Sequence, residues 1–267
     1  MTGAVKGTEG RRCWMGDLPS RIKASPLCSV SIPGSHDSFT YSLEQRGGAG
    51  PDQPPCIRAL TRRFPTISSW LLYRWSVTQR RTVSEQLEAG VRYLDIRLQA
   101  LTEQGEREFR VLHCLLGERV TTLLAQIKLF LLQNKSEVVI LDFHHLYQFE
   151  PRDHERLTQL LLTMFRGLLC SWQQDTRQLS IASMGASGAR LIVIYPAIYQ
   201  HRGHTDSKIQ LYPGTQEYFW PRTLCPTPWP DREGARSSYL QSRARPQAPG
   251  STSSPSYLSC CRHTGQQ

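Results

Sequence analysis

The chain has 267 residues, 39% of them hydrophobic, and 32 Lys and Arg against 22 Asp and Glu give a formal net charge of +10. This composition can build a sizeable core and excludes a chain that is disordered throughout. No run of about 18 apolar residues is present, which argues against a membrane-spanning helix. The basic residues are dispersed and form no nucleic-acid motif, so the charge favours an anionic membrane surface or a phosphate-bearing substrate over nucleic acid.

Residues 1–24 form an N-terminal segment without the apolar stretch of a signal peptide, which argues against secretion. The eight cysteines are scattered, with no CxxC pair and no metal-finger spacing, so we expect reduced thiols. They are Cys13, Cys28, Cys56, Cys114, Cys170, Cys225, Cys260 and Cys261. These features predict a cytoplasmic protein, with peripheral membrane association still open.

Strands alternate with helices along the middle of the chain. Period-two and continuous apolar patterns predict strands, and apolar stripes with helical spacing predict helices. The expected strands are 29–32, 91–98, 109–113, 138–144 and 190–195, and the expected helices are 82–89, 119–132 and 157–164. This order is typical of a parallel α/β sheet, for which a TIM-like barrel and a doubly wound sheet are the economical solutions.

Three further segments have a distinct composition. Residues 47–55 are rich in Gly and Pro and predict a loop, and residues 64–75 are rich in aromatic side chains. For 64–75 we expect packing on the fold, with contact to a lipid interface as the alternative. Residues 226–267 are rich in Pro and Ser and nearly without aliphatic residues, which predicts a disordered tail.

A closed barrel needs about three more strand–helix units than the chain offers, so we expect the barrel to be incomplete at its C-terminal end.

Polar side chains follow or end four of the predicted strands. In a parallel barrel these strand ends meet at one mouth, where active sites are built. Two imidazoles, a guanidinium and carboxylates there would suit phosphoryl transfer without a metal, since one imidazole can take a proton while the other donates one. The residues are His36 and Asp37, Asp95 and Arg97, His113, and Asp142 with His144.

Each of these residues also has a purely structural interpretation. His36 and Asp37 can be turn residues, and Asp95 and Arg97 can form a buried ion pair. For His144 and His145 a hydrogen-bonded structural role is favoured over catalysis. Cys114 is interpreted as a small buried residue, because no motif of a nucleophilic cysteine surrounds it.

Five segments, in this order, resemble the phosphatidylinositol-specific phospholipase C X-domain-containing proteins. They are Ser31–Ser38, Trp75–Gln79, Glu85–Arg97, Val111–His113 and Glu137–Phe143. The resemblance runs from about Cys13 to Pro230 and implies an X-box domain over 25–225 with a TIM-barrel-like phosphodiesterase fold. After Pro228–Pro230 the sequence departs from the family pattern, which indicates a divergent, truncated C-terminus.

The resemblance also implies a reaction and a role for each residue. The inositol 2-hydroxyl of a phosphatidylinositol or phosphoinositide at a membrane surface would attack the phosphodiester and release diacylglycerol and an inositol phosphate. His36 would be the general base and His113 the general acid, with Asp37 orienting His113 and Arg97 binding the phosphate beside Asp95. Arg97 would repel the Ca²⁺ that metal-dependent relatives bind between carboxylates, so no metal or other cofactor is expected.

The leading hypothesis is therefore a metal-independent phosphoric diester hydrolase of lipid degradation and signalling. The rival is a catalytically inactive isoform that binds anionic lipid or inositol phosphate through Arg97 and the basic surface. A metal-dependent glycerophosphodiesterase is the third possibility, and Arg97 argues against it because such an enzyme would want a carboxylate ligand there. No protein partner is indicated by the sequence.

Overall fold

The computed structural model describes residues 9–45, 48–172, 178–196, 200–201, 204–205 and 211–221. The strands are β1 (Gly34–Ser35), β2 (Tyr93–Glu103), β3 (Glu106–His113), β4 (Leu115–Arg119), β5 (Val139–Tyr147), β6 (Leu191–Tyr195), β7 (Gln200–His201), β8 (His204–Thr205) and β9 (Phe219–Pro221). The α-helices are α1 (Glu9–Arg12), α2 (Trp14–Asp17), α3 (Ser20–Lys23), α4 (Pro55–Arg63), α5 (Pro65–Ser76), α6 (Val83–Glu88), α7 (Val120–Gln133), α8 (Pro151–Met164) and α9 (Ile181–Ser187). Short 3₁₀ helices are η1 (Leu27–Ser29), η2 (Thr40–Ser42) and η4 (Gln216–Tyr218).

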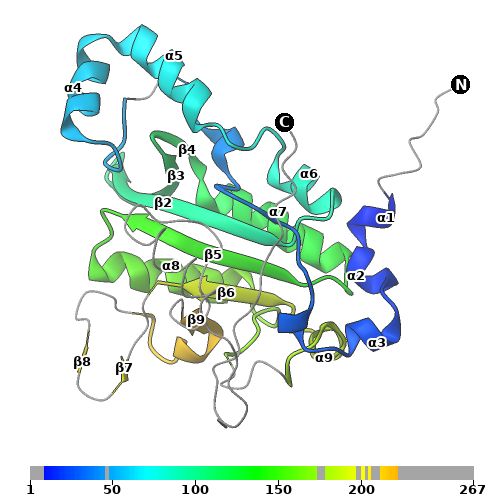
Figure 1. The fold of residues 1–267 in the computed structure, drawn as a ribbon. Coiled ribbons are helices and arrows are strands. Elements are labelled where there is room, and N and C mark those ends of the chain that lie inside the picture. Colours follow the sequence, from blue (N-terminus) through cyan, green and yellow to red (C-terminus); the bar gives the residue numbers. More distant parts are fainter. Residues whose placement is uncertain are drawn as a thin grey trace, which may run out of the picture.

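A seven-stranded sheet forms the centre of the molecule (Figure 1). Its order is β4-β3-β2-β5-β6-β9, and β1 lies beside the first residues of β2. Strands β1, β2, β5, β6 and β9 are parallel, whereas β2, β3 and β4 form an antiparallel meander. The α/β, TIM-barrel-like class is thus confirmed, with the sheet open between β4 and β9 in the part of the chain described here.

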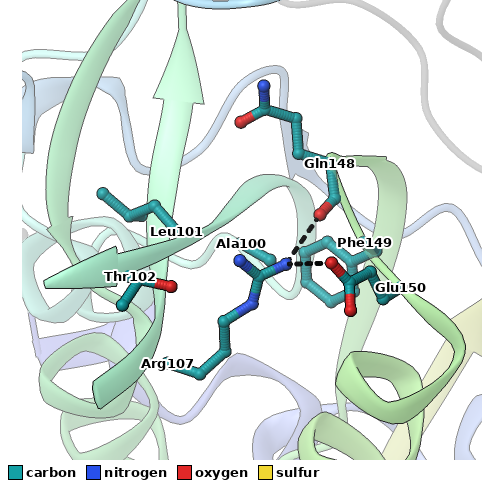
Figure 2. A pocket seen from close by; sticks show the side chains of 7 residues that line it. All are labelled: Ala100, Leu101, Thr102, Arg107, Gln148, Phe149 and Glu150. Carbon is teal, nitrogen blue, oxygen red and sulfur yellow. Dashed lines mark hydrogen bonds and ion pairs between the residues drawn. The ribbon is translucent and has the colours of Figure 1, made fainter. Parts of the chain in front are cut away.

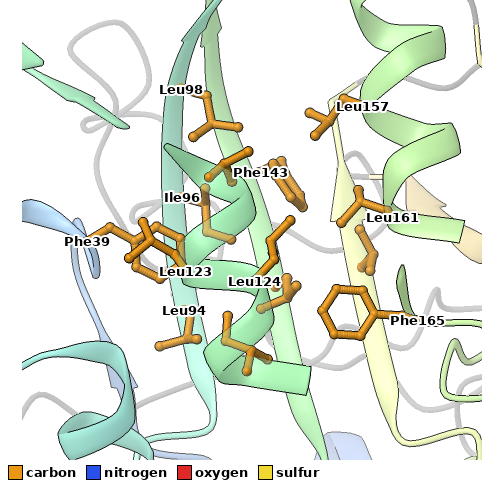
Figure 3. Close-up of a cluster of buried hydrophobic side chains, with 14 of the residues drawn as sticks. Phe39, Leu94, Ile96, Leu98, Leu123, Leu124, Phe143, Leu157, Leu161 and Phe165 are labelled. Carbon is orange, nitrogen blue, oxygen red and sulfur yellow. The ribbon is translucent and has the colours of Figure 1, made fainter. Parts of the chain in front are cut away.

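Helices α7 and α8 cover one face of this sheet. Alternate residues of a strand point to opposite faces, so Leu94, Ile96 and Leu98 of β2 share the helix-covered face with Phe143 of β5. Figure 3 shows these side chains packed against Leu123, Leu124, Leu157, Leu161 and Phe165 of the helical layer. This large core fixes the positions of β2 and β5, the strands on which the polar residues lie.

The opposite face of the sheet carries a smaller apolar cluster and the polar residues. Met15, Leu27 and Ile32 from the N-terminal part of the chain pack there against Ile140 and Ile192. Asp95 and Asp142 follow on the same face, two residues beyond Tyr93 and Ile140 respectively. The apolar cluster therefore closes one end of this face, and the polar residues occupy the strand positions that come next.

Most predicted elements are confirmed, but the first strand is wrong. Residues 27–29 form a 3₁₀ helix, and the short β1 starts only at Gly34. Pro33 has no N–H to donate, and its carbonyl oxygen accepts hydrogen bonds from the backbone N–H groups of Arg92 and Tyr93. The apolar residues at 30 and 32 are buried because they pack into the smaller cluster, not because they form a strand.

The expectation of a wholly parallel sheet is also wrong, because β3 runs antiparallel to β2. Gln104 and Gly105 connect them, and both have positive φ angles, of 51° and 86°. Two such residues form the tight turn that matches the twist of a hairpin. The hairpin brings the end of β3 back toward the middle of β2, where Leu98 pairs with Val111.

Residues 64–75 also differ from expectation. Residues 65–75 lie in α5, where Leu72 and Tyr73 pack against the core as predicted. The prediction is wrong for the exposed side chains, which are Phe64, Ile67, Trp70, Leu71 and Trp75. Residues 48–54 precede α4 without regular structure, as predicted, and Pro55 is the first residue of α4.

Several sequence predictions fall partly outside the described residues. Cys13, Cys28, Cys56, Cys114 and Cys170 are free thiols, whereas Cys225, Cys260, Cys261 and the 226–267 tail lie outside the described part of the chain. None of the helices described has the length and apolar run that crossing a bilayer needs.

A buried ion pair connects the N-terminal segment to the sheet. Arg92 Nη2 lies 2.7 Å from Glu137 Oε2, and both side chains have an exposed fraction of 0%. Glu137 Oε1 also accepts a hydrogen bond from the backbone N–H of Gly16 at 3.0 Å, and Arg92 donates to the carbonyl oxygen of Leu87 at 2.6 Å. Removing one partner would leave a buried charge without compensation.

We expect Glu137→Ala to lower the free energy of unfolding by about 3–5 kcal/mol, the usual cost of breaking a buried pair. Urea unfolding followed by circular dichroism measures this change. Glu108→Ala is the matched control, because its partner Arg119 is 50% exposed and such pairs contribute about 1 kcal/mol or less. Equal losses in the two variants would contradict this account of the pair.

Candidate active site

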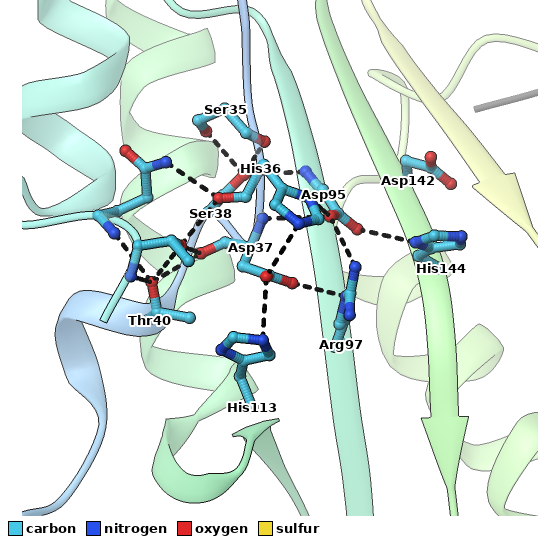
Figure 4. A network of polar contacts seen from close by, with 12 residues as sticks. Ser35, His36, Asp37, Ser38, Thr40, Asp95, Arg97, His113, Asp142 and His144 are labelled. Carbon is cyan, nitrogen blue, oxygen red and sulfur yellow. Dashed lines mark hydrogen bonds and ion pairs between the residues drawn. The ribbon is translucent and has the colours of Figure 1, made fainter. Parts of the chain in front are cut away.

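The turn after β1 places His36 and Asp37 against β2 (Figure 4). The backbone N–H of Ser38 donates to the carbonyl oxygen of Asp95 at 2.9 Å, and the hydroxyl oxygen of Ser38 accepts from the backbone N–H of Asp95 at 2.8 Å. Gln86 Nε2 of α6 donates to the carbonyl oxygen of Ser38 at 2.8 Å. Asp37 has a φ of 47°, which turns its side chain toward the strands.

Asp95 is the buried centre of the polar cluster, with an exposed fraction of 0%. Its Oδ2 accepts the backbone N–H of Asp37 at 3.1 Å and lies 2.8 Å from His36 Nδ1. Burial pushes the pKa of Asp95 upward, but hydrogen bonds from His144 and His36 and the charge of Arg97 outweigh it and hold that pKa well below its ordinary value. Asp95 is therefore a fixed negative charge that orients His36.

Asp37 lies between the two imidazoles that the sequence singles out. Its Oδ2 is 3.2 Å from His36 Nε2 and 3.3 Å from His113 Nε2. Its Oδ1 is 2.5 Å from Arg97 Nε, and Arg97 Nη2 is 3.6 Å from Asp95 Oδ2. The structure thus brings together all five residues predicted for the site, and Arg97 is close to both carboxylates.

His113 reaches the site by a route that the sequence did not predict. It ends an antiparallel strand, so the hairpin, and not a shared barrel mouth, carries it back to Asp37. His113 Nδ1 lies 2.8 Å from the carbonyl oxygen of Ser76 at the end of α5. Because a carbonyl oxygen only accepts, Nδ1 carries a proton and Nε2 faces Asp37.

Cys114 follows His113 in a left-handed conformation, with a φ of 61°. Its backbone N–H donates to Asp52 Oδ2 at 2.7 Å, and Gln53 Nε2 donates to its sulfur at 3.1 Å. A residue other than glycine is strained in this left-handed conformation, by on the order of 1 kcal/mol. Cys114 is half-buried rather than fully buried, and the contacts with residues 52–53 hold the chain where it leaves His113.

His144 lies at the site beside Asp95, and the sequence favoured a hydrogen-bonded structural role for it over catalysis. The pairing of β2 with β5 shifts between Ile96 and Arg97, so that Phe143 and His145 pair with consecutive residues and His144 is the extra one. His144 Nδ1 lies 3.5 Å from Asp95 Oδ1. Bulges of this kind re-aim side chains next to active sites. The bulge at His144 is visible only in the pairing register of β2 and β5, and no sequence pattern indicates it.

Two other polar residues near the site, Asp142 and His145, contact aromatic side chains beside the site. Asp142, which the sequence grouped with the site, accepts a hydrogen bond from the Tyr93 hydroxyl at 2.5 Å. The His145 ring stacks on that of His144, with centroids 4.4 Å apart, and is tilted against that of Tyr147, with centroids 5.6 Å apart. The contact of Ser76 with His113 was not foreseen, since a backbone carbonyl oxygen leaves no residue-type signal.

His36, Asp37 and Asp95 each offer a ligand atom within 4.8 Å of the others, which is close enough for a metal ion. The set contains one ring nitrogen and two carboxylates, whereas Ca²⁺ takes 6–8 oxygen ligands. Arg97 already lies against both carboxylates, and its positive charge opposes a second cation. The residues present therefore fit calcium poorly.

A separate pocket of about 560 Å³ lies farther along β2 (Figure 2). It is lined by Ala100, Leu101, Thr102, Arg107, Gln148, Phe149 and Glu150. Arg107 donates to Asp153 Oδ2 at 2.6 Å and to the carbonyl oxygen of Gln148 at 3.0 Å, so its guanidinium is engaged by the protein itself. None of the residues of the imidazole cluster lines this pocket.

The fold and site together define an α/β protein with two imidazoles and a guanidinium arranged around two buried carboxylates. No protein-family model matches the chain. Human PI-PLC X domain-containing protein 2 is 31% identical over 227 residues, which cover 85% of this chain and 69% of that protein. PI-PLC X domain-containing protein 3 of Danio rerio is 31% identical over 216 residues, covering 81% of this chain and 63% of the relative.

The chain belongs to the PI-PLC X domain-containing protein family. It spans about two thirds of the length of these curated relatives. Among solved structures it is similar to a mutant phosphatidylinositol-specific phospholipase C of Staphylococcus aureus, at 16% identity and a TM-score of 0.47 over 70% of this chain and 53% of that one. The corresponding phospholipase of Listeria monocytogenes gives 20% identity and a TM-score of 0.44 over 69% of this chain and 56% of that one.

The lowered pKa of Asp95 predicts how stability depends on pH. The folded state keeps this carboxylate ionised at pH values where an unfolded Asp, with a pKa of about 3.9, takes up a proton. Asp95 therefore stabilises the fold above that pH, and this contribution is lost as the pH falls toward the lowered value. We expect Asp95→Asn to flatten the fall in unfolding free energy between about pH 5 and pH 3.

Urea unfolding at a series of pH values measures this dependence. Asp17→Asn, which changes an exposed carboxylate in the same way, is the matched control and should retain the pH dependence of the unchanged protein. If Asp95→Asn and the unchanged protein lose stability in parallel over this range, Asp95 does not stay ionised as described.

Proposed function

We propose that this chain is a metal-independent phosphodiesterase that cleaves phosphatidylinositol-type lipids, with His36 as general base and His113 as general acid. The observation that carries the proposal is the placement of the Asp37 carboxylate between the Nε2 atoms of the two imidazoles, with Arg97 on its other oxygen. Membership of the PI-PLC X domain-containing family supports the choice of substrate class.

His36 is suited to take a proton. Its Nδ1 lies 2.8 Å from the Asp95 carboxylate, which only accepts, so Nδ1 keeps a proton. Its Nε2 faces Asp37 Oδ2 at 3.2 Å, and once Nε2 has released its proton it offers a lone pair to the attacking hydroxyl. The negative charge of Asp95 stabilises the imidazolium that forms when Nε2 accepts the proton of the attacking hydroxyl. Asp95, which the resemblance left without a role of its own, is thus the group that orients the base.

His113 is suited to donate a proton. Its Nδ1–H is fixed on the carbonyl oxygen of Ser76, and its Nε2 faces the Asp37 carboxylate. A carbonyl oxygen on one nitrogen and a carboxylate near the other match the two N–H groups of an imidazolium. Protonated His113 then gives its Nε2 proton to the leaving oxygen.

Each of the two proton transfers accompanies one bond change at phosphorus. His36 takes the proton of the inositol 2-hydroxyl as its oxygen bonds to phosphorus, and the bond from phosphorus to the diacylglycerol oxygen breaks as His113 protonates that oxygen. Attack from within the same molecule makes the first product a cyclic inositol phosphodiester. Arg97 binds a phosphoryl oxygen and stabilises the charge that develops there, which is the role that a metal would otherwise have.

We expect His36→Gln and His113→Gln each to lower the release of water-soluble inositol phosphate from phosphatidylinositol vesicles by about 10²–10⁴-fold, the contribution of a positioned acid or base. A chelator should leave the activity of the unchanged protein as it is. His154→Gln is the control, because this imidazole contacts the Tyr195 hydroxyl at 3.0 Å in the core and should be dispensable for turnover.

The same assay separates this proposal from its rivals. Circular dichroism must show that each sample is folded. A folded chain that binds anionic vesicles but releases no product would be the inactive, lipid-binding isoform, and activity abolished by chelator would indicate a metal-dependent phosphodiesterase. Either result contradicts the two-histidine mechanism.

A further inference from the structure

The exposed apolar side chains of this protein gather on one helical segment. Among the described residues, six of the nine exposed large hydrophobic side chains lie between positions 60 and 75. Figure 1 shows the helices that carry them, α4 and α5, standing out from the body beside β3 and β4. The six are Leu60, Phe64, Ile67, Trp70, Leu71 and Trp75, and we call them the α4–α5 apolar face.

The inner side of α5 packs Leu72 and Tyr73 on the core, but both tryptophans of the helix lie on its outer side. Ser69 and Ser76 are buried, with exposed fractions of 5% and 0%, whereas Ile67 and Trp75 are 74% and 78% exposed. A surface helix of a water-soluble protein normally buries its large apolar residues and exposes its serines. An apolar patch of this extent therefore indicates an interaction surface.

The charges around the α4–α5 apolar face are of one sign. Between Asp52 and Glu85 the sequence contains six arginines and no acidic residue. The guanidinium of Arg63 lies 5.4 Å from the ring centroid of Phe64, and that of Arg74 lies 5.2 Å from that of Trp70. Tryptophan beside basic residues on an exposed helix is the composition that lies at the headgroup level of an anionic bilayer.

The segment that follows the α4–α5 apolar face contacts both imidazole-bearing residues of the candidate site. The carbonyl oxygen of Ser76 lies 2.8 Å from His113 Nδ1. Thr78 Oγ1 and Gln79 Nε2 donate to the carbonyl oxygen of His36 at 3.1 and 3.0 Å. Residues 76–79 therefore connect α5, and any surface that α5 contacts, to the site where the phosphodiester would be cleaved.

We infer that α4 and α5 are the membrane-docking element of this protein. Trp70, Trp75 and Ile67 enter the interfacial region of an anionic leaflet while the arginines contact its lipid phosphates. Docking holds the imidazole cluster, in which the His36 side chain is 35% exposed, near headgroups of the same leaflet. The inference rests on the proposed function only for the identity of the lipid that is cleaved, since docking itself needs no turnover.

Co-sedimentation of the purified full chain with vesicles tests this inference. The vesicles are phosphatidylcholine alone and phosphatidylcholine mixed with phosphatidylserine, neither of which carries an inositol headgroup for the candidate site. We expect salt-sensitive binding to the anionic vesicles, weakened at least about tenfold by Trp70→Ala with Trp75→Ala. Arg62→Ala with Arg63→Ala should weaken binding to the anionic vesicles and reduce its salt dependence.

Matched controls come from exposed apolar residues elsewhere on the fold. Leu129 and Leu132 of α7 are 56% and 51% exposed, and Trp172 is 36% exposed. Leu129→Ala with Leu132→Ala, and Trp172→Ala, should bind vesicles as the unchanged protein does. Alanine favours helix, so the circular dichroism spectrum of the tryptophan variant should show the helix content of the unchanged protein.

The outcomes separate docking from catalysis. Vesicle binding that is unchanged in the tryptophan variant overturns the inference, as does a dimer in solution that this variant converts to a monomer, because the surface would then join two copies of the chain. Docking that is lost in the tryptophan variant, together with retained cleavage of a water-soluble inositol phosphodiester, supports it. Docking by a chain that cleaves nothing refutes only the proposed function.

Discussion

The site depends on two buried carboxylates that share one guanidinium. Asp37 and Asp95 have exposed fractions of 3% and 0%, and Arg97 lies against both. An unpaired buried charge costs several kcal/mol, so the fold must bring cationic or hydrogen-bonding groups to this pair. The turn after β1, the β2–β3 hairpin and the bulge in β5 supply them in the form of a backbone N–H, His113 and His144.

The same requirement gives the site its chemistry. A cluster that holds Arg97 and two imidazoles around carboxylates presents N–H donors and a basic nitrogen where a phosphodiester can lie. The helices that would meet the lipid are joined to this cluster through residues 76–79, whose backbone and side chains contact His113 and His36. Lipid docking and acid–base chemistry would then depend on one continuous stretch of chain.

Much of this molecule follows from local sequence patterns. The spacing of Thr82 and Glu85 is typical of a capping box and Gly90 suits a helix end, and the structure has both the capping box of α6 and a positive φ at Gly90. The alternation along β2 places Asp95 and Arg97 opposite its apolar residues. The antiparallel return of β3 and the bulge at His144 could not be predicted, because both are set by pairing between strands distant in the sequence. The exposure of Trp75 violates the general preference for burial, and such exceptions mark a surface with another purpose.

In the proposed reaction the two imidazoles cleave a phosphodiester by internal attack without a metal. Phosphorus NMR of phosphatidylinositol vesicles incubated with the purified chain and a chelator tests it most directly. A cyclic inositol phosphodiester that forms first, at a rate independent of the chelator, is the predicted result. A phosphomonoester as the first product, or product only after a divalent metal is added, would contradict it.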